Sequence, residues 1–463
     1  MKVGLCFMGL FDLFGGNKKK EEEAAALAEK RKEEEAIKEK EDQIAAHEGL
    51  EWPHPVPISR IRTQGEEPDV FEDPVSQERK DEIGPLIYEE KIGLDTLKFL
   101  TLPELLFVLT TLEFYNSKGK LKGFSENHRI LYNELLNRVR DAKMIYCLYD
   151  DATKFPFIEN GFAYIYLEKE IAQQVAAAYG KQYRRLTVKD CPAVPEGAES
   201  TDRGFFDYLY YLGIERIIID NGRYRARFSR SEIVAPPDFG QDQKKAPMNP
   251  QLRLAMLDFL SEARWPVKYE KRAQVVQTKE ARMVALARAG RYIVPIQHEG
   301  PAEMMSDGRI KFNKDTKLRF PVMKTNNGKL FLPIFTDGIE FSKKFGREGF
   351  EGAVFRFSDI LRFVQDKDGL AINPMGENIM LPKDKMMALE AASRMMAESK
   401  NAGKTVNEAN AQDIIKRASA EDVADKIIQM PKRTQDADEA SEKTNSTQTS
   451  DSSVETADIT PEN

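Results

Sequence analysis

The sequence predicts an α+β protein in which two tandem modules follow each other, each a small, mostly antiparallel sheet packed with helices. Short aromatic and β-branched runs of strand length alternate with longer segments in which apolar residues recur at helical spacing. The same order of segments occurs twice, before and after a Pro-, Gln- and Lys-rich break. Both ends of the 463-residue chain are poor in core-forming residues, so the folded part is expected in the middle.

Residues 1–82 are predicted to form an N-terminal segment with a charged helix and a Pro-rich linker. Residues 18–48 are almost entirely Lys, Glu, Arg and Ala, which are good helix formers. Ile37 and Ile44 are seven positions apart, but two positions do not define a coiled coil, so a single charged helix or a disordered spacer is expected. Trp52-Pro-His-Pro-Val-Pro57 then predicts an extended, polyproline-like linker.

The beginning of the chain carries a short apolar stretch, which contains Leu10, Phe11, Leu13 and Phe14. These side chains could make a weak membrane-surface contact or enter a partner groove, and the alternative is an unpacked terminus. Asp12 interrupts the stretch and no small-residue cleavage site follows, so a signal peptide is not expected. Either Met1 or Met8 could be the start of translation.

Residues 83–235 are predicted to form the first module. Helical spacing covers residues 94–115, with Pro103 acceptable in a first turn after Thr101, and a second helix follows. Later predicted elements are strands at 144–149 and 162–167, a helix at 168–179, and β runs at 216–220 and 223–228. Because Asn221-Gly222 lies between the last two runs, and both residues tolerate positive φ, a tight hairpin is predicted there.

Residues 236–250 are predicted to be a linker, residues 251–400 the second module, and residues 401–463 a polar, largely disordered tail. The second module is expected to begin with two helices and to continue with a strand at 292–297. Asn326-Asn327-Gly328 predicts a hairpin between strands at 318–323 and 330–335. Strands at 369–373 and 379–381 flank Pro374-Met375-Gly376, and a helix from Lys383 closes the module.

Two strings of the second module carry a resemblance to a known family. Phe335-Thr336 opens a predicted helix, and Asn373-Pro374 ends a strand, with Gly376 and Asn378 following. With these motifs, residues 283–387 resemble the SseB N-terminal-domain family of bacteria. The first module resembles it more distantly, as a divergent copy, with Leu167-Glu168 in place of the Phe-Thr pair and Asp220-Asn221-Gly222 in place of the Asn-Pro turn. The family name is linked to enhanced serine sensitivity and to type III secretion, and the resemblance implies no catalytic residue.

Three arginines of the first module form a candidate binding site. Arg223, Arg225 and Arg227 alternate with Tyr224, Ala226 and Phe228, so on a strand they would share one face. A row of guanidinium groups suits a carboxylate or phosphate partner. The alternative is that they form the solvent-exposed face of an amphipathic strand.

A second candidate site lies on the motifs of the second module. Thr336 and Asp337 are expected to cap the following helix, or to line a ligand groove. Asn373, Pro374 and Gly376 are expected to form a turn, or to line the same groove.

Composition restricts the function. The net charge of −7 argues against a broadly basic nucleic-acid binder, and three cysteines without metal-ligand spacing favour a reducing compartment. Four scattered histidines form no metal or catalytic pattern, and no apolar run is long enough to span a membrane. We therefore expect a cytoplasmic, non-enzymatic adaptor for an unidentified protein partner, with no cofactor and no metal. The alternative is an enzyme or small-ligand receptor that binds an anion in a cleft between the modules. The sequence does not indicate an oligomeric state.

Overall fold

The computed structural model describes residues 12–58, 71–193, 204–236, 247–304, 310–312, 315–345, 349–387 and 455–459. The chain divides into two compact units. Unit 1 comprises Met1–Ser59, Thr63–Ala142 and Ile218–Arg227, and unit 2 comprises Arg60–Arg62, Lys143–Ile217 and Phe228–Asn463. Among the described residues, no helix combines the length and the apolar content needed to cross a membrane.

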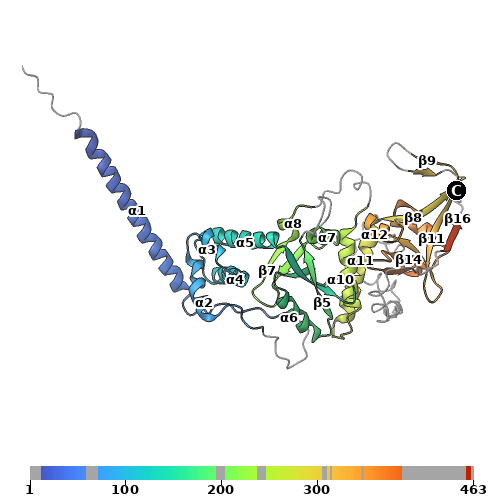
Figure 1. Ribbon diagram of the computed structural model, residues 1–463, viewed down its shortest axis with the longest axis horizontal. Helices are drawn as coiled ribbons and strands as arrows, with labels where there is room; N and C mark the ends of the chain where they lie inside the picture. The colour runs from blue at the N-terminus through green and yellow to red at the C-terminus, as the bar shows by residue number, and fades with distance from the viewer. Residues whose placement is uncertain are drawn as a thin grey trace, which may run out of the picture. The chain divides into compact units, whose positions relative to one another are not determined.

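Unit 1 is mainly helical (Figure 1). Its helices are α1 (Asp12–Ala46), α2 (Gln77–Ile83), the 3-10 helix η1 (Gly84–Tyr88), α3 (Leu94–Lys98), α4 (Leu102–Lys118) and α5 (Phe124–Asp141). The predicted helical region 94–115 is divided between α3 and α4. The division occurs because Thr101 and Glu104 form a capping box that begins α4, with a proline in its first turn.

Part of the N-terminal segment after α1 packs in the core of unit 1. The ring of Trp52 lies 6.2 Å from the ring of Phe107 and 5.3 Å from the ring of Tyr115, both on α4. Ile58 and Val75 are buried. Apolar side chains in a polar, Pro-rich stretch therefore give it a fixed place against α4.

The first sheet follows α5 along the chain. Its strands are β1 (Met144–Asp150), β2 (Phe155–Pro156), β3 (Ile158–Glu159), β4 (Phe162–Tyr166), β5 (Leu186–Pro192), β6 (Arg216–Ile219) and β7 (Ala226–Ser229). Its helices are α6 (Lys169–Gly180), α7 (Phe205–Tyr211) and α8 (Arg230–Ile233). The strand order is β2-β1-β4-β6-β7, with β3 beside β4 and β5 antiparallel to β1.

The second sheet has the strand order β13-β8-β11-β12-β14-β15, with β16 beside β11. Its strands are β8 (Arg291–Glu299), β11 (Lys317–Lys324), β12 (Leu330–Ile334), β13 (Glu351–Arg356), β14 (Gly369–Ile372), β15 (Ile379–Pro382) and β16 (Glu455–Ile459). β9 (Ala302–Met304) and β10 (Ile310–Phe312) form a separate pair. The helices between the strands are α12 (Gly338–Phe345), α13 (Phe357–Ile360) and η2 (Leu361–Val364). β12 and β14 are parallel, whereas β8, β11, β13, β15 and β16 pair antiparallel with their described neighbours in this sheet.

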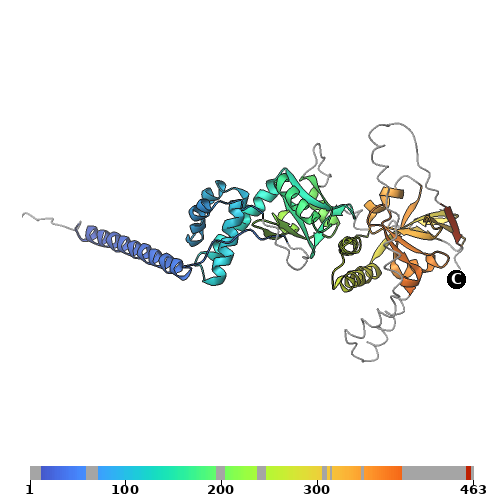
Figure 2. The same ribbon diagram turned by 90° about the horizontal axis from the view of Figure 1, so that it is seen from below.

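Two helices, α10 (Pro250–Ala263) and α11 (Arg272–Ala289), cover the second sheet. Figure 2 shows them side by side and nearly end-on beside it. Met256 and Leu260 of α10 and Val284 of α11 belong to one buried cluster with Leu332 and Leu370 of the sheet. This apolar layer holds the polar end of the sheet in place, as described below.

The two sheets share one order of elements. In each, a first strand (β1 or β8) is followed by a hairpin that ends in a buried strand (β4 or β12) and by a helix (α6 or α12). The next strand returns antiparallel to the first (β5 to β1, β13 to β8). A short helix and a final strand pair, β6–β7 or β14–β15, complete the order.

The predicted α+β class is confirmed. The predicted hairpin at residues 326–328 is also present, because Gly328 adopts φ +80° between β11 and β12. Within the predicted tail, Glu455–Ile459 forms β16, and the rest of residues 401–463 lies outside the described residues. Most of the apolar stretch around Leu10 lies outside them as well. The predicted domain boundaries stay predictions.

Candidate functional site

The predicted site residues of the second module meet at one end of its sheet. Because β12 and β14 are parallel neighbours, with Ile334 opposite Ile372, the residues after both strands emerge at the same edge. The residues that follow the two strands are Thr336, Asp337, Asn373, Pro374 and Gly376. The structure therefore brings together five positions that lie on two separate segments of the chain.

Asn373 joins the two strand ends. Its Oδ1 accepts the backbone N–H of Thr336 at 2.9 Å, and its Nδ2 donates to Oγ1 of Thr336 at 2.8 Å and to Oε2 of Glu377 at 2.9 Å. Its φ is +47°, a left-handed value that asparagine tolerates better than most residues. Its carbonyl oxygen also accepts the backbone N–H of Gly376 at 2.8 Å, which closes the turn that contains the buried Pro374.

Asp337 begins α12. Its Oδ1 accepts the backbone N–H groups of Ile339 at 3.0 Å and Glu340 at 2.9 Å, which otherwise lack partners at a helix N-terminus. Its Oδ2 accepts the hydroxyl of Thr336 at 2.8 Å. The expected capping role is therefore present for Asp337, whereas Thr336 contacts the cap through its hydroxyl and accepts no N–H group of the helix in these contacts.

A buried arginine completes the site. Arg253 of α10 is 2% exposed, and its Nε donates to Oε1 of Glu377 at 2.6 Å while its Nη2 donates to Oε1 of Glu340 at 2.7 Å. Its Nη1 lies 3.5 Å from Oδ2 of Asp337. We call the group formed by Arg253, Asp337, Glu340 and Glu377, with Thr336 and Asn373, the Arg253 cluster.

The charges of the Arg253 cluster are unequal. Three buried carboxylates face Arg253. Among the described residues, the further cation paired with this group is Lys343, whose Nζ lies 2.7 Å from Oε1 of Glu340 and whose side chain is 40% exposed. Burial raises the pKa of Glu340; Arg253 opposes this shift, and Glu377 adds to it. Burial alone would lower the pKa of Arg253, but the neighbouring carboxylates outweigh it and hold that pKa above its usual range. Oε2 of Glu340 is buried without a hydrogen-bond partner.

The acidic residues of this cluster lie in a region that matches a known family. Residues 269–387 match the family model of the SseB protein N-terminal domain. We call this region the SseB-like domain; all three carboxylates and Asn373 lie inside it, whereas Arg253 precedes it. The match does not extend to residues 83–235, so the divergent first copy stays a prediction. Neither the comparison with curated proteins nor that with solved structures gave a match.

Arg253, Glu340 and Glu377 were not among the residues that the sequence predicts for this site. Arg253 did carry a signal, because it stands on the apolar face of α10, three and four positions before the buried Met256 and Leu257. A charge on a buried face requires a buried partner. The partners, however, come from the start of α12 and from the turn after β14, far along the chain, and their identity depends on the tertiary fold.

Gly376 is required by close packing against Glu340. A Cβ atom placed on it would lie 2.6 Å from Oε2 of Glu340. We expect Gly376→Ala to lower the free energy of unfolding of unit 2 by about 1–3 kcal/mol, because the cluster has no room for a methyl group. Chemical denaturation, monitored by the hydrogen exchange of residues 369–382, measures this effect.

Gly338, at the first position of α12, is the matched control. A Cβ atom there meets nothing within 4 Å, so Gly338→Ala should leave stability within about 0.5 kcal/mol of the wild type. Equal effects of the two variants would contradict the close-packing explanation of Gly376.

The arginine site predicted in the first module is not a strand face. β7 begins at Ala226, so only Arg227 lies on the strand, and the prediction is wrong for Arg223 and Arg225. The preceding segment is irregular because Asp220 and Gly222 have φ of +54° and +103°. The predicted turn at Asn221-Gly222 is present, because the backbone N–H of Arg223 donates to the carbonyl oxygen of Asp220 at 3.1 Å, but the paired strands β6 and β7 end at Ile219 and begin at Ala226, so the connection is longer than predicted.

Contacts within unit 1 fix this segment. The carbonyl oxygen of Arg223 accepts the backbone N–H of Val56 at 3.2 Å, and the hydroxyl of Tyr224 donates to Oδ2 of Asp73 at 2.9 Å. Nη1 of Arg225 donates to Oδ1 of Asn221 at 2.9 Å. The backbone of this loop is thus fixed within unit 1, while Arg223, Arg225 and Arg227 are all less buried than Tyr224 and Ala226 between them.

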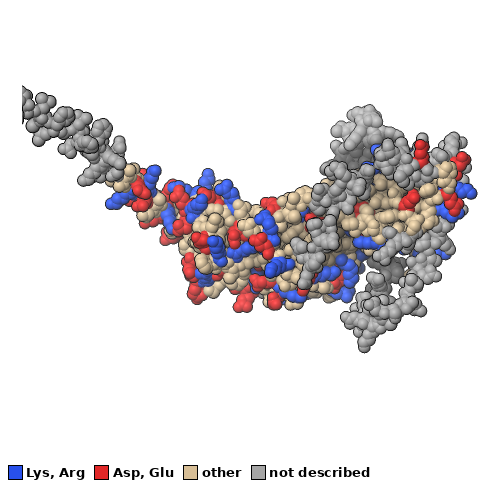
Figure 3. Space-filling view, turned by 45° about the horizontal axis from the view of Figure 1, so that its top comes forward, with Lys and Arg blue, Asp and Glu red and all other residues tan. Residues whose placement is uncertain are grey.

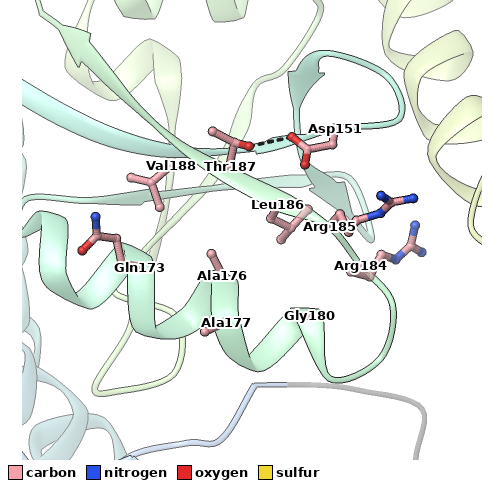
Figure 4. Close-up of a pocket in the computed structure, with 10 residues that line it drawn as sticks. All are labelled: Asp151, Gln173, Ala176, Ala177, Gly180, Arg184, Arg185, Leu186, Thr187 and Val188. Carbon is pink, nitrogen blue, oxygen red and sulfur yellow. Dashed lines mark hydrogen bonds between the residues drawn. The ribbon is translucent and has the colours of Figure 1, made fainter. Parts of the chain in front are cut away.

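A groove lies on the first sheet between α6 and the edge strand β5 (Figure 4). Its volume is about 540 Å³. Small or uncharged side chains of α6 line one side, and residues of β5 and the turn before it line the other. The lining residues are Asp151, Gln173, Ala176, Ala177, Gly180, Arg184, Arg185, Leu186, Thr187 and Val188.

The two arginines of the groove differ in their contacts with the rest of the protein. Arg184 is held in place, because its Nη1 donates to the carbonyl oxygen of Ser261 at 2.7 Å and its guanidinium lies 3.9 Å from the ring of Trp265. Arg185 is exposed. The single acid of the groove, Asp151, accepts the hydroxyl of Thr187 at 2.6 Å. Nη2 of Arg184 also lies 3.7 Å from Oε2 of Glu262, so Arg185 is the exposed cation at this end of the groove.

Elsewhere the surface carries both signs of charge. Figure 3 shows Lys and Arg intermingled with Asp and Glu over the visible face of the described residues. Across the ranges that the structure describes, no group of three or more His, Cys, Asp or Glu side chains has the arrangement needed to hold a metal ion.

Proposed function

We propose that the protein is a non-enzymatic adaptor that binds an extended peptide segment of a protein partner in the groove between α6 and β5. The observation that carries this proposal is the open edge of β5. All seven residues of β5 pair with β1, and no other described strand lies on its second edge. Backbone N–H and C=O groups on such an edge can pair with an added strand.

The lining of the groove supports a peptide as the ligand. Ala176, Ala177 and Gly180 leave space beside the strand, and a Cβ atom added to Gly180 would meet nothing within 4 Å. Leu186 and Val188 of β5 are half-buried and provide apolar contacts. Because Arg185 is exposed at one end, we expect the bound segment to carry a carboxylate there.

The chemistry of the lining also favours binding over catalysis. The residues that line the groove include no His, Cys, Lys or Tyr, and the hydroxyl of Thr187 is already bonded to Asp151. A nucleophile with an adjacent base is therefore missing from this set. Cys147 and Cys191 are free and buried, which agrees with a reducing, cytoplasmic location for such an adaptor.

We also infer that the first sheet is a diverged copy of the SseB-like domain. The shared order of strands and helices supports this inference, and so does the left-handed φ of Asp220 and Asn373, which follow β6 and β14. The second copy carries the acidic residues that bind Arg253, and the first has a groove beside its returning strand. On this inference, one copy binds peptides and the other is specialised to hold α10.

The proposal is tested by selecting peptides from a displayed random library against the full-length chain. Fluorescence anisotropy then measures the binding of a selected peptide to the wild type and to Ala177→Trp. The indole ring would fill the groove, so we expect the affinity to fall by about tenfold or more, which corresponds to about 1.4 kcal/mol.

Gln174→Trp is the matched control, because Gln174 is exposed on α6 but does not line the groove. The control should bind the peptide as the wild type does. Failure to select any peptide, or equal losses in the two variants, would overturn the proposal. Binding of small anions alone, abolished by Arg185→Ala, would instead support the ligand-receptor alternative.

A further inference from the structure

The middle of β11 has no partner from the sheet itself. β8 pairs with Lys317 to Arg319, and β12 pairs with Met323 and Lys324. Among the described strands, the stretch between these two pairings is covered only by β16, which runs antiparallel to residues 318–322 of β11. Figure 1 shows β16, in red, beside β11 at the edge of the second sheet. An uncovered strand edge is a template for pairing with another extended segment.

The register and the composition of the two strands are complementary. β11 carries Lys317, Arg319 and Lys324 and no acid, whereas β16 has the sequence Glu-Thr-Ala-Asp-Ile. Arg319 stands opposite Asp458, and Leu318 stands opposite Ile459. Opposite charges in directly facing positions of an antiparallel pair are stabilising. Pro321 has no backbone N–H, so it weakens this edge for permanent pairing.

The length of the intervening chain permits a reversible contact. Residues 388–454 separate the end of the SseB-like domain from β16. The entropic cost of bringing two positions of a chain together rises only slowly with the number of residues between them. Residues 455–459 therefore keep a substantial local concentration near β11. β16 contributes only five residues to the sheet, so its departure would leave the pairings of β11 with β8 and β12 in place.

We propose that the edge of β11 is a binding site for an extended acidic segment, and that residues 455–459 of the same chain occupy it in cis. A partner segment with a similar acidic sequence that ends in an apolar residue would bind in trans when the chain's own strand is displaced. This site is independent of the groove between α6 and β5, and it gives the SseB-like domain a binding function of its own.

Disulfide trapping tests the cis contact in the full-length chain. In a Cys6→Ser background, Arg319→Cys and Asp458→Cys face each other, within the Cα separation that a disulfide requires. The control pair, Arg319→Cys with Thr456→Cys, is displaced by two residues, because Thr456 faces Pro321. Under mild oxidation we expect the facing pair to form at least about fivefold more cross-link, measured by peptide mass spectrometry. Equal yields would overturn the proposal.

A second measurement tests the site in trans. The probe is a fluorescein-labelled synthetic copy of residues 451–463, measured by anisotropy. Ala457→Pro interrupts β16, so this full-length variant should bind the probe about tenfold more tightly than the wild type, whose edge is occupied. Ser446→Pro, outside β16, should bind as the wild type does. Adding Arg319→Glu to Ala457→Pro should abolish the gain, whereas Ala177→Trp should leave it unchanged. Equal binding by the wild type and Ala457→Pro would contradict the cis occupancy.

Discussion

Replacing Arg253 by methionine is expected to lower the free energy of unfolding of unit 2 by about 3–5 kcal/mol. The variant leaves the carboxylates of Asp337, Glu340 and Glu377 buried with no guanidinium between them. Removal of one partner from a buried ionic group costs more than the group contributes when intact, because the remaining charges stay desolvated. Lys343 cannot replace Arg253, since its ammonium lies at the exposed side of Glu340.

Hydrogen exchange gives the most direct readout of this loss. The backbone N–H of Thr336 donates to Oδ1 of Asn373 inside the Arg253 cluster, so its exchange rate reports opening of the cluster itself. We expect strongly accelerated exchange at Thr336 in Arg253→Met. The exchange rate of Thr336 in Arg253→Lys should lie between those of the wild type and Arg253→Met, because an ammonium keeps the charge but cannot bind three carboxylates in a fixed geometry.

Arg356→Met is the control for the loss of an arginine as such. Arg356 is exposed on β13, so its replacement should change stability by less than about 0.5 kcal/mol. If Arg253→Met exchanged at Thr336 as slowly as this control, the cluster would not hold α10 to the domain. A global denaturation curve alone is less informative, because a chain of several folded parts does not unfold in two states.

The sequence was sufficient for the elements that depend on local chemistry. The Asn-Asn-Gly hairpin, the Pro103 position in α4 and the capping of α12 by Asp337 all follow from what neighbouring residues require of the backbone. The sequence did not predict the local conformation where contacts with a distant segment of the chain determine it. Asn221-Gly222 resembles a tight hairpin, yet Tyr224 binds Asp73 and draws the loop away from strand geometry.

The same distinction applies to the candidate site. The sequence predicts Thr336, Asp337 and Asn373 as site residues because they follow strands at motif positions. The parallel pairing of β12 with β14 then brings them together. Arg253 and Glu377 are 124 positions apart, and nothing local to either one indicates the other. The groove beside β5 could not be foreseen at all, since it depends on the distance between a helix and a strand edge.

The unequal charge of the Arg253 cluster predicts a pH dependence that Glu340→Gln removes. Burial raises the pKa of Glu340, so the folded protein binds a proton there more tightly than the unfolded chain, in which the pKa is about 4.3. The stability that this proton contributes is fully present below about pH 4.3 and is lost as the pH rises through the raised pKa of the folded state. The maximum slope for one such proton is about 1.4 kcal/mol per pH unit.

Thr336 exchange and denaturation midpoints of the wild type and Glu340→Gln, measured from pH 5 to pH 8, test this expectation. A neutral amide keeps an acceptor for Nη2 of Arg253 and removes one of the three buried negative charges. The variant should therefore gain stability relative to the wild type as the pH rises. Glu270→Gln, at an exposed position between α10 and α11, is the control and should follow the wild type at every pH. Parallel curves for Glu340→Gln and the wild type would show that Glu340 is ionised in both states, and that Arg253 and Lys343 together neutralise the cluster.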